Sequence, residues 1–480
     1  MADILNEEKK TGMPRSVPYI IGNEAAERFS FYGIRSIMST FLVAQFFNPA
    51  HNPLLQQVAE ARANELAHMF AFVAYFMPLI GGILADWFLG KYKVIFYVSI
   101  LYACGNTVVA LSTGNLTMFT VGLMIIACAA GGIKSCVSAN VGDQFDKSNE
   151  HLLSKMYGWF YFTINTGSTL ALFFVPYLYN NYGAELAFAV PGVLMVLATI
   201  VFWMGRKKYV RVPPSGPKRE NFVTISFWAI GQSFRKKNGQ PFWERLGAEH
   251  NVSEKAIDGV RAVYRILLVF AFTPIFWALW DQNLSEWVLQ ATKLDRHLFF
   301  GREVFPEQVQ LANTIFLISL IPVFTYWVYP LFEKAGMKPT PLRKIGTGLF
   351  LTAISFVVIA LLQEKVDAGL HPSVWWQILA YFILAAAEIL VSVTCLEYAY
   401  THSPKSMKST MSALYLLGIS LGNLLDSLVN KSIANHGFFS RFTGAKYYWL
   451  FIGIISAFFI LYLLVAKRLP EKRYVGEATE

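Results

Sequence analysis

Charged residues are scarce in this chain of 480 residues: Asp, Glu, Lys and Arg make up 15% of it, against about 25% in an ordinary soluble domain. Hydrophobic residues make up 55% of the sequence and aromatic residues 16%. A water-exposed surface of that composition would be insoluble, so a soluble enzyme is excluded. A membrane-spanning helix needs about 20 apolar residues, and half of this chain therefore supplies roughly twelve spans. That number favours a transporter.

The chain also lacks the cysteine pairs and short motifs of many enzyme sites. It has neither HExxH nor GxxxxGK[ST], so a metalloprotease or an ATP-driven pump lacks its chemistry. A GxSxG pattern occurs at 418–422, but it lies in an apolar helical segment, where small residues favour close helix packing. We expect no enzyme activity, no cofactor and no metal. No CxxC pair is present, and we interpret the four cysteines as small buried hydrophobic residues: Cys104, Cys128, Cys136 and Cys395.

The net charge is +10, from 41 Lys and Arg against 31 Asp and Glu. A basic domain can bind nucleic acid, but here the basic residues cluster between hydrophobic segments, as at 206–211 and 467–473. Retention of positive charge on the cytoplasmic side of a membrane explains such clusters. We therefore expect lipid around the chain and no nucleic-acid partner.

Twelve apolar segments follow one another in two groups of six. The first group is 17–47, 63–89, 93–113, 116–141, 153–179 and 186–205. The second group is 260–290, 308–332, 342–362, 373–401, 407–433 and 447–466. The polar break between the groups includes NFVTISFWAIG, which is too short to cross a bilayer and predicts short surface helices.

This layout is typical of an all-α membrane protein with the major facilitator fold, in which twelve transmembrane helices form two six-helix bundles around a midplane cavity. We predict an N-terminal bundle at 1–206, a cytoplasmic linker at 207–258, a C-terminal bundle at 259–468 and a cytoplasmic tail at 469–480.

The distribution of Lys and Arg among the short loops predicts the orientation. The loops after spans two, four, eight and ten are basic, whereas those after spans three and five hold no Lys or Arg. The loops after spans seven, nine and eleven hold some, so the C-terminal half gives a weaker signal. With the basic linker added, the positive-inside rule places both termini in the cytoplasm of a cell membrane, and we expect a bacterial inner membrane. The polar first residues, MADILNEEKKTG, lack the apolar core of a signal peptide, so the first span would direct insertion.

Four charged residues lie in the first span: Glu24, Glu27, Arg28 and Arg35. A charge at a helix centre costs about 2.5–3.5 kcal/mol, so each requires a partner or a water-filled cavity. Glu24, Arg28 and Arg35 fall on one helix face, with Glu27 to one side, and Glu24 and Arg28 can pair at i and i+4. A purely structural ion network is the alternative to a functional one.

Further ionisable residues lie in other apolar spans: His68, Lys134, Asp281 and Glu388. A lone histidine is usually a hydrogen-bonded core residue. Acids facing bases in one cavity can, however, exchange protons near neutral pH, as a proton-coupled carrier requires. The same charges, held apart, suit a zwitterionic ligand with its carboxylate toward Arg35 and Lys134 and its ammonium toward Glu388.

Polar residues also recur at helical spacing. Tyr157, Tyr161 and Asn165 share one face of span five, where helix packing and a binding wall are equally good interpretations. Trp277 with Asp281, and Glu388 with Ser392, repeat the i, i+4 relation. Glu397 is half a turn out of phase with Glu388 and should point elsewhere, near the cytoplasmic end, and Asp426 has no assigned role.

The segment EAAERFSFYG at 24–33 resembles the ExxERFxYYG motif of the proton-dependent oligopeptide transporter family. FYFTINTGS at 160–168 resembles that family's span-five signature, and GGILADWFLGKYK at 81–93 resembles the major facilitator motif after span two. FWALWDQ at 276–282 and EILVSVTCLEY at 388–398 are similar to its span-seven and span-ten segments. The resemblance covers most of the chain from about 15 to 465, apart from the linker, which lacks the two extra spans of many bacterial members.

The resemblance implies roles for individual positions. The residues that hold the peptide termini would be Arg35, Lys134, Asn165 and Glu388. The pocket walls and polar contacts would be Tyr32, Tyr75, Tyr161, Trp277, Asn313 and Ser392. The proton-coupling motif would be Glu24, Glu27 and Arg28, with Lys134 as its charge partner. The groups linked to the extracellular gate would be Arg35, His68 and Asp281, with Arg265 as a further ion-pair partner of Asp281. His68 and Asp281 would also take part in proton coupling.

Two positions depart from the family pattern. Phe31 replaces the first tyrosine of the motif, and Tyr415 occupies a position that often holds tryptophan. Both put the side-chain preference in doubt.

The resemblance implies a symporter that imports di- and tripeptides with protons by alternating access. Protonation of Glu24, Glu27 or Asp281 would weaken the ion pairs of a gate. The alternatives are a carrier of the same fold for nitrate or an amino-acid-like solute, and a peptide receptor that does not transport. The side-chain preference, the proton stoichiometry and the oligomeric state are left open.

Overall fold

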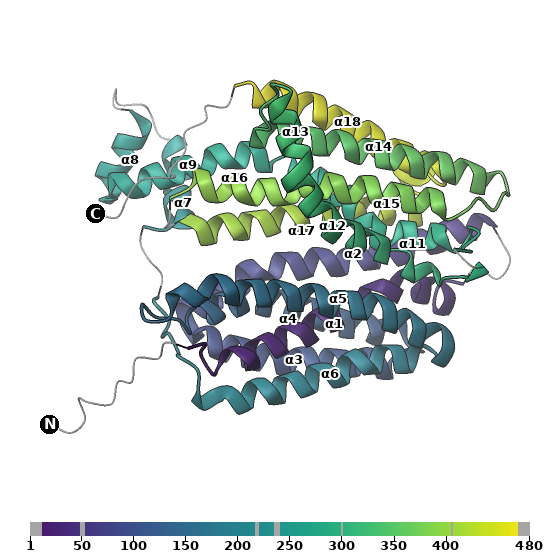
Figure 1. Cartoon of the computed structure of the whole chain (residues 1–480), viewed down its shortest axis with the longest axis horizontal. Helices are drawn as coiled ribbons and strands as arrows, with labels where there is room; N and C mark the ends of the chain where they lie inside the picture. The colour runs from purple at the N-terminus through teal and green to yellow at the C-terminus, as the bar shows by residue number, and fades with distance from the viewer. Residues whose placement is uncertain are drawn as a thin grey trace.

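The computed structural model describes residues 12–48, 53–216, 220–234, 241–298, 301–404 and 407–468, and it is helical almost throughout. The N-terminal half consists of α1 (Val17–Gln45), α2 (Pro53–Ile83), α3 (Lys91–Leu111), α4 (Leu116–Gly142), α5 (Leu153–Tyr182) and α6 (Ala184–Met204). The π-helical turn η1 (Leu84–Leu89) extends α2. These helices lie together as one bundle in the lower part of Figure 1.

The C-terminal half forms the second bundle, above the first in Figure 1. Its helices are α9 (Glu254–Phe270), α10 (Thr273–Asp281), α11 (Glu286–Ala291), α12 (Leu311–Val323), α13 (Tyr329–Lys334), α14 (Pro341–Asp367), α15 (Trp375–Glu388), α16 (Thr394–His402), α17 (Lys408–Ala434) and α18 (Ala445–Ala466). The linker contains α7 (Phe222–Ser233) and α8 (Phe242–His250), so the predicted surface helices are present. The predicted tail at 469–480 lies outside the described residues.

Several of the C-terminal helices are segments of one span. The axis bends by 46° between α9 and the segment formed by α10 and α11. Pro274 stands in the first turn of α10, where its missing N–H is no loss but where it prevents α9 from continuing. π-helical turns, η7 (Phe324–Val328) and η8 (Ile389–Val393), join α12 to α13 and α15 to α16. Such turns aim side chains away from the regular helical register.

Within the described residues, nine helices are long and apolar enough to cross a membrane, or ten when the bent pair of α9 and α10–α11 counts as one span. The helices α1 and α5, with 29 and 30 residues, are also longer than the roughly 20 residues that a span needs, but they carry more polar side chains. With these two included, each half has six spans. The major facilitator architecture expected from the sequence is confirmed.

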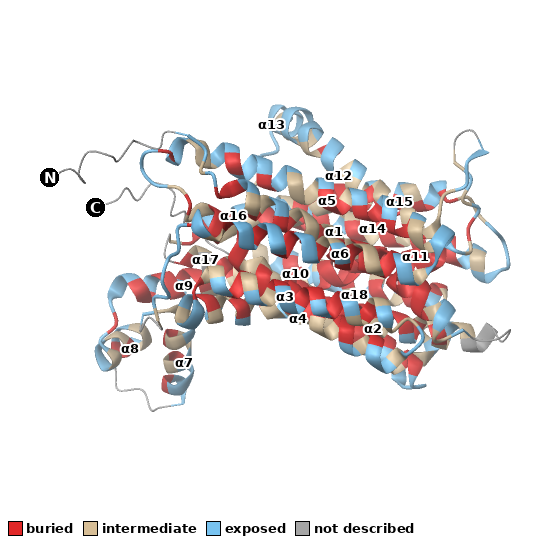
Figure 2. Ribbon diagram, turned by 90° about the horizontal axis from the view of Figure 1, so that it is seen from below, coloured by how far each residue is buried: buried red, intermediate tan, exposed pale blue. Residues whose placement is uncertain are grey.

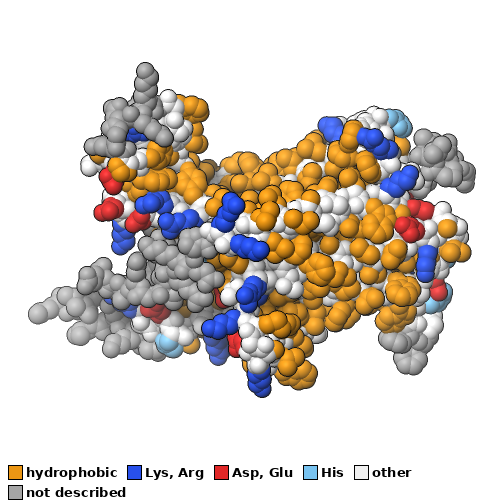
Figure 3. Space-filling model, turned by 90° about the horizontal axis from the view of Figure 1, so that it is seen from above, with side chains coloured by type: hydrophobic (Ala, Val, Ile, Leu, Met, Phe, Trp, Pro, Cys, Tyr) orange, Lys and Arg blue, Asp and Glu red, His pale blue; other side chains and the backbone are white. Residues whose placement is uncertain are grey.

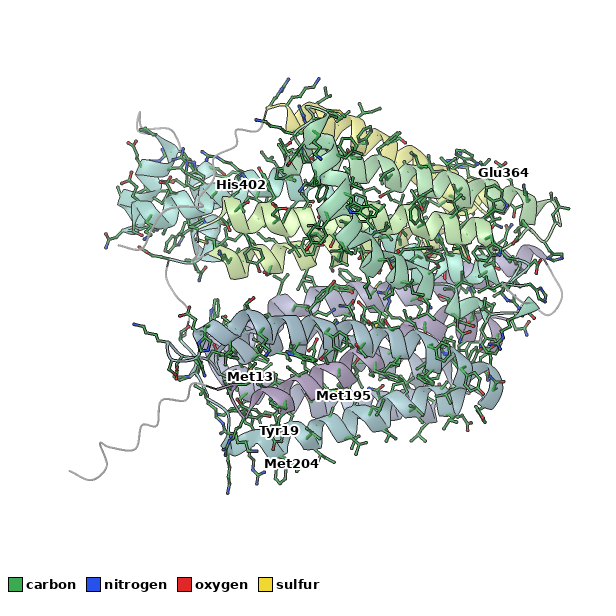
Figure 4. The ribbon with its side chains drawn as sticks, viewed as in Figure 1. Met13, Tyr19, Met195, Met204, Glu364 and His402 are labelled. Carbon is green, nitrogen blue, oxygen red and sulfur yellow. The ribbon has the colours of Figure 1, made fainter. Side chains whose placement is uncertain are left out.

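The molecular surface agrees with a membrane protein. Hydrophobic side chains cover the middle of the molecule in Figure 3, and Lys and Arg gather toward its two ends. Leu461 and Leu464 of α18 are 50% and 57% exposed, as expected of side chains that face lipid. The buried residues run through the interior of both bundles in Figure 2. In Figure 4, His402 and Tyr19 lie toward the end that carries the linker, and Glu364 lies toward the opposite end.

The two halves meet chiefly where α2 packs against α17. Ser420 donates a hydrogen bond to the carbonyl of Phe72 (2.9 Å) across this interface. A Cβ on Gly422 would come within 2.5 Å of the carbonyl of Pro274, so only glycine permits this approach of α17 to α10. The GxSxG pattern is therefore a helix-packing feature, as the sequence analysis proposed.

Candidate functional site

The charged residues of α1 form an ion-pair cluster inside the N-terminal half. The guanidinium of Arg28 lies 2.9 Å from Glu24 Oε1 and 2.5 Å from Glu27 Oε2. All three side chains are buried, and Glu27 is fully so. The predicted i, i+4 pair of Glu24 and Arg28 is present. Two carboxylates share one guanidinium, so these three side chains together carry one more acidic group than basic groups.

Lys134 brings a second positive charge to this cluster from α4. Its Nζ lies 4.1 Å from the ring centroid of Tyr75 and 5.0 Å from that of Phe31. Among the described residues, no carboxylate lies within 4.0 Å of this amine. Lys134 thus adds its charge to the cluster through aromatic faces, not through a direct contact with Glu24 or Glu27.

Phe31 is the centre of this arrangement. Its ring is fully buried, and the cationic groups of Arg28 and Arg35 lie 6.0 and 5.8 Å from its centroid, in addition to Lys134. Tyr32 packs edge-on against it at 5.5 Å. The Tyr32 hydroxyl interacts electrostatically with charges of both halves, since Arg28, Arg35, Asp281 and Glu388 all act on it. Because Phe31 stands where the family motif has tyrosine, the side chain has no hydroxyl, and the three cations face a purely aromatic ring.

Arg35 joins the two halves. Its Nη2 lies 2.8 Å from Asp281 Oδ1, at the end of α10, and both side chains are buried. The other oxygen of Asp281 accepts a hydrogen bond from Asn423 Nδ2 at 2.6 Å. Because Asn423 belongs to α17, this carboxylate binds one donor from each half.

His68 of α2 makes the second buried contact between the halves. Its Nδ1 lies 2.9 Å from Asn423 Oδ1, and its Nε2 lies 3.0 Å from Glu286 Oε2. Asn423 uses its NH₂ group on Asp281, so its oxygen faces His68 and requires a hydrogen on Nδ1. The Nε2 atom of His68 also lies 3.0 Å from the Ser285 hydroxyl, so it faces both Ser285 and Glu286.

The structure brings together Arg35, His68 and Asp281, the three residues expected at a gate. It also adds residues that the sequence analysis did not select. Glu286 lies against His68 and accepts hydrogen bonds from Asn430 and the Tyr447 hydroxyl, both at 3.0 Å. Asp426, left without a role, lies 3.7 Å from His68 Nδ1. A signal was present: Asn423, Asp426 and Asn430 follow one another at i, i+3 and i+7 on an otherwise apolar helix.

The role expected for Arg265 must be corrected. The resemblance implied an ion pair between Arg265 and Asp281, but Asp281 pairs with Arg35. Arg265 lies in α9, 16 residues before Asp281, which corresponds to roughly 24 Å along helices of 1.5 Å rise. The break between α9 and α10 does not shorten that separation enough for contact.

Glu388 occupies the C-terminal side of the site, at the junction of α15 with η8. Its Oε2 accepts hydrogen bonds from Trp280 Nε1 at 2.8 Å and from Asn313 Nδ2 at 3.1 Å. Both donors are neutral, and among the described residues no Lys or Arg lies within 4.0 Å of this carboxylate. Glu388 is thus held in place by neutral donors and has no ion-pair partner among the described residues.

The remaining expected pocket residues are distributed around Glu388 and along α5. Ser392 and the Tyr415 hydroxyl form a 2.6 Å hydrogen bond, and Trp277 packs edge-on against Tyr415. Asn165 donates to the carbonyl of Tyr161 one turn earlier, and the Tyr161 side chain is 54% exposed. Glu397 lies away from this group, 3.9 Å from Lys344, in agreement with its helical phase.

No metal site accompanies these residues: in the part of the chain that the structure describes, no group of three or more His, Cys, Asp or Glu side chains could hold a metal ion. The site offers instead two ionisable groups of opposite sign that have no direct ion-pair partner among the described residues, Lys134 and Glu388, and a buried hydrogen-bonded network between the halves.

The comparisons with known proteins identify the family of the chain. The family model described as the POT family matches residues 92–450. Peptide transporter 3 of Caenorhabditis elegans is 36% identical over 379 residues, which cover 75% of this chain and 52% of that protein. Solute carrier family 15 member 2 of Mus musculus is 34% identical over 401 residues, which cover 79% of this chain and 53% of that protein. The chain thus spans about half the length of these relatives.

Solved structures match over nearly the whole chain. The crystal structure of an auto-inhibited POT family peptide transporter has a TM-score of 0.88 at 31% identity and covers 97% of this chain and 99% of that one. The POT family transporter PepTSo has a TM-score of 0.85 at 35% identity, with coverage of 95% and 98%. This chain therefore belongs to the POT family, the proton-dependent oligopeptide transporters, and is a multi-pass membrane protein.

Proposed function

We propose that this chain is a symporter that imports di- and tripeptides together with protons. The observation that carries the proposal is a pair of ionisable groups in the two halves that lack a direct ion-pair partner among the described residues, Lys134 over aromatic rings and Glu388 among neutral donors. A peptide is a zwitterion whose carboxylate would pair with Lys134 and whose ammonium would pair with Glu388. A ligand that binds both charges draws the two halves together, which couples binding to the movement of one half against the other.

Proton coupling is proposed to rest on the two carboxylates of α1, Glu24 and Glu27. Glu24 and Glu27 share Arg28, so a proton on Glu27 neutralises one carboxylate and weakens the hold on Arg28. The change in charge acts electrostatically on Lys134, which lies over the same Phe31 ring as Arg35. Arg35 in turn holds Asp281 of the other half, which connects the proton site to the gate.

The proposed orientation follows from the basic residues near the end of α6. Arg206, Lys207, Lys208 and Arg211 lie beside the linker, and the positive-inside rule places them in the cytoplasm of a cell membrane. The linker and both termini would then be cytoplasmic. The Arg35–Asp281 and His68–Glu286 contacts would belong to a closed extracellular gate.

The test is uptake of radiolabelled dialanine into proteoliposomes under an imposed inward proton gradient and membrane potential. We expect uptake that dipeptides and tripeptides inhibit and free amino acids do not. Uptake of another solute but not of peptides would overturn the substrate. Peptide binding without counterflow would identify a receptor, because a receptor does not exchange its ligand across the membrane.

A further inference from the structure

The segment that follows α6, residues 205–215, carries four basic residues and no acidic one: Arg206, Lys207, Lys208 and Arg211. Arg206 is half-buried and the other three are exposed. Among the described residues, no carboxylate lies within 4.0 Å of these four charges, whereas Lys91 of the neighbouring α3 pairs with Asp143 at 2.7 Å. We refer to residues 205–215 as the basic strap. Its positive charge is not neutralised by a direct ion pair.

Aromatic rings hold three of these cations in place. The pairs, with the distance from the cationic group to the ring centroid, are Arg206 over Trp203 (3.6 Å), Lys208 over Tyr19 (4.5 Å) and Arg211 over Tyr92 (4.0 Å). Stacking uses the face of a guanidinium and leaves the N–H groups in its plane available for oxygen ligands. Arg206 and Arg211 each donate from one nitrogen to a backbone carbonyl, at 3.2 and 2.6 Å. Their remaining N–H groups can bind an anion.

The backbone of the basic strap is fixed to the N-terminal half. Val210 donates to Gln144 Oε1 at 2.9 Å and accepts from Gln144 Nε2 at 3.2 Å. The N–H of Ser215 donates to the carbonyl of Asp86 at 2.8 Å. The buried ring of Tyr209 stacks on Phe202 of α6. Because the strap is already ordered, an anion that binds its cations need not immobilise them, and the entropic cost of binding is small.

The basic strap begins where a lipid-facing stripe of α6 ends. Val193, Leu197, Ile200 and Met204 follow one another at i, i+4, i+7 and i+11, and they are between 48% and 58% exposed. Met204 is the last residue of α6 and stands two positions before Arg206. In Figure 4, Met204 and Tyr19 lie at the linker end of the N-terminal half, on the side away from the C-terminal half. The strap therefore stands where hydrocarbon gives way to lipid headgroups.

We propose that the basic strap binds the headgroup of an anionic phospholipid in the leaflet that this end of the molecule faces. The phosphodiester oxygens would accept from the N–H groups of Arg206 and Lys208, and the acyl chains would lie along the exposed stripe of α6. The site is continuous with the lipid-facing surface, which favours a lipid over a free anion. A zwitterionic lipid brings an ammonium group that the unpaired cations repel.

The proposed orientation makes this leaflet the cytoplasmic one, where anionic lipids attract basic segments. The inference goes beyond peptide transport, because it holds whichever solute the central site carries.

The binding test is native mass spectrometry of the full chain, titrated with phosphatidylglycerol and with phosphatidylcholine of the same acyl chains. Each Lys or Arg near an anionic surface contributes roughly fivefold to binding, so Arg206→Gln/Lys208→Gln should weaken the tightest phosphatidylglycerol site about 25-fold. Phosphatidylcholine binding should stay within about twofold.

Lys334→Gln/Lys338→Gln is the matched control. Both lysines are exposed, and the double substitution removes the same charge from the segment between α13 and α14. It should leave the tightest phosphatidylglycerol site unchanged. Equal weakening by the two double variants would show a diffuse attraction and overturn the site. Displacement of the bound lipid by millimolar inorganic phosphate would identify a free-anion site instead and overturn the lipid.

A second measurement locates the lipid and needs no variant to fold. Proteoliposomes receive photoactivatable phosphatidylglycerol or phosphatidylcholine, each with a diazirine on the acyl chain close to the glycerol. In the wild-type protein, phosphatidylglycerol should label the peptide that spans residues 193–211 several-fold more than phosphatidylcholine does. Equal labelling of this peptide by the two lipids would overturn the proposal, as would a phosphatidylglycerol preference confined to other peptides.

Discussion

Arg35 of the N-terminal half and Asp281 of the C-terminal half form a buried ion pair of 2.8 Å, and Asn423 binds the second oxygen of the same carboxylate. Asp281 lies where α10 ends and the chain passes through the short helical turn Gln282–Leu284 into α11. The pair therefore ties α1 to the most irregular span of the other half. Any movement that separates the halves at this end must break it.

Asp281→Asn tests this pair. The substitution leaves the Arg35 guanidinium buried without a counter-charge, and the loss of one partner of a buried pair costs about 3–5 kcal/mol. We expect the substitution to destabilise the closed state by most of this amount. Distances between spin labels at the ends of α2 and α17 should shift toward a separated state, and gradient-driven uptake should fall at least about tenfold. The double variant Arg35→Gln/Asp281→Asn should be less open than the single variant. Equal opening of the two variants would contradict the pairing.

Glu27→Gln tests proton coupling. The Glu27 carboxylate is fully buried against Arg28, and a glutamine of the same shape cannot be protonated or ionised. We expect gradient-driven dialanine uptake to be lost while counterflow persists, because exchange requires no net proton movement. Glu27→Asp, which keeps a titratable group, serves as the control. Uptake that still follows the pH gradient in Glu27→Gln would contradict the role of Glu27 in proton coupling.

Lys134→Ala tests the cationic side of the site. The amine lies over Tyr75 and Phe31, an arrangement worth about 0.5–2 kcal/mol. We expect its removal to abolish uptake driven by a proton gradient. In binding measurements, dialanine should lose affinity while dialanine amide, which has no carboxylate, should bind as before. Normal driven uptake by this variant would refute the role of Lys134.

The architecture could be predicted because each span is a long apolar segment that can be recognised from its composition. The segment expected at 17–47 is α1 at Val17–Gln45, and the linker was recognisable because its single apolar stretch is too short to cross. The breaks were harder to predict. Pro274 indicates where α10 begins, but the π-helical turn at 389–393 has no local marker, and its register depends on tertiary packing.

The contacts of the site also differ in whether the sequence could predict them. Glu24 and Arg28 lie on one helix, so their pairing follows from the 3.6-residue period alone. The Glu286–His68 contact joins residues 218 positions apart, and no periodicity predicts which buried acid meets a given histidine. Lys134 shows the same limit, since the resemblance implied a charge partner of the motif on α1, and its contacts with the rings of Phe31 and Tyr75 could not be predicted.

The linker offers a test of pH dependence outside the membrane. The backbone N–H and the hydroxyl of Ser253 both donate to the Glu220 carboxylate at 2.8 Å, which lowers the pKa of Glu220 below its ordinary value of 4.5. Ser253 also caps α9 through the N–H of Ala256. A lowered carboxyl pKa stabilises the folded linker at neutral pH, and that contribution is lost as the pH falls through the shifted value.

Hydrogen exchange of the first turn of α9 measures this contribution. Ser253→Ala should weaken protection there by the roughly 0.5–2 kcal/mol of a lost N-cap. Glu220→Gln should have a smaller effect, present at neutral pH and absent below the shifted pKa. An effect of Glu220→Gln that persists in acid would show that the charge of Glu220 is irrelevant.

Glu388→Gln tests the recognition of the peptide amino terminus. Glu388 is oriented by Trp280 and Asn313, so the charge can be removed while both hydrogen bonds to its oxygen remain. A peptide ammonium then loses an ionic partner in a poorly solvated site, where a charged hydrogen bond contributes about 1.5–3 kcal/mol, or roughly 10- to 150-fold in affinity. We expect dialanine to bind more weakly by that factor and N-acetyl-dialanine to be unaffected. Because the acetylated peptide lacks the ammonium, it separates loss of this contact from a general distortion of the site. Weakening of both ligands to the same extent would assign Glu388 to the shape of the pocket and not to the ammonium.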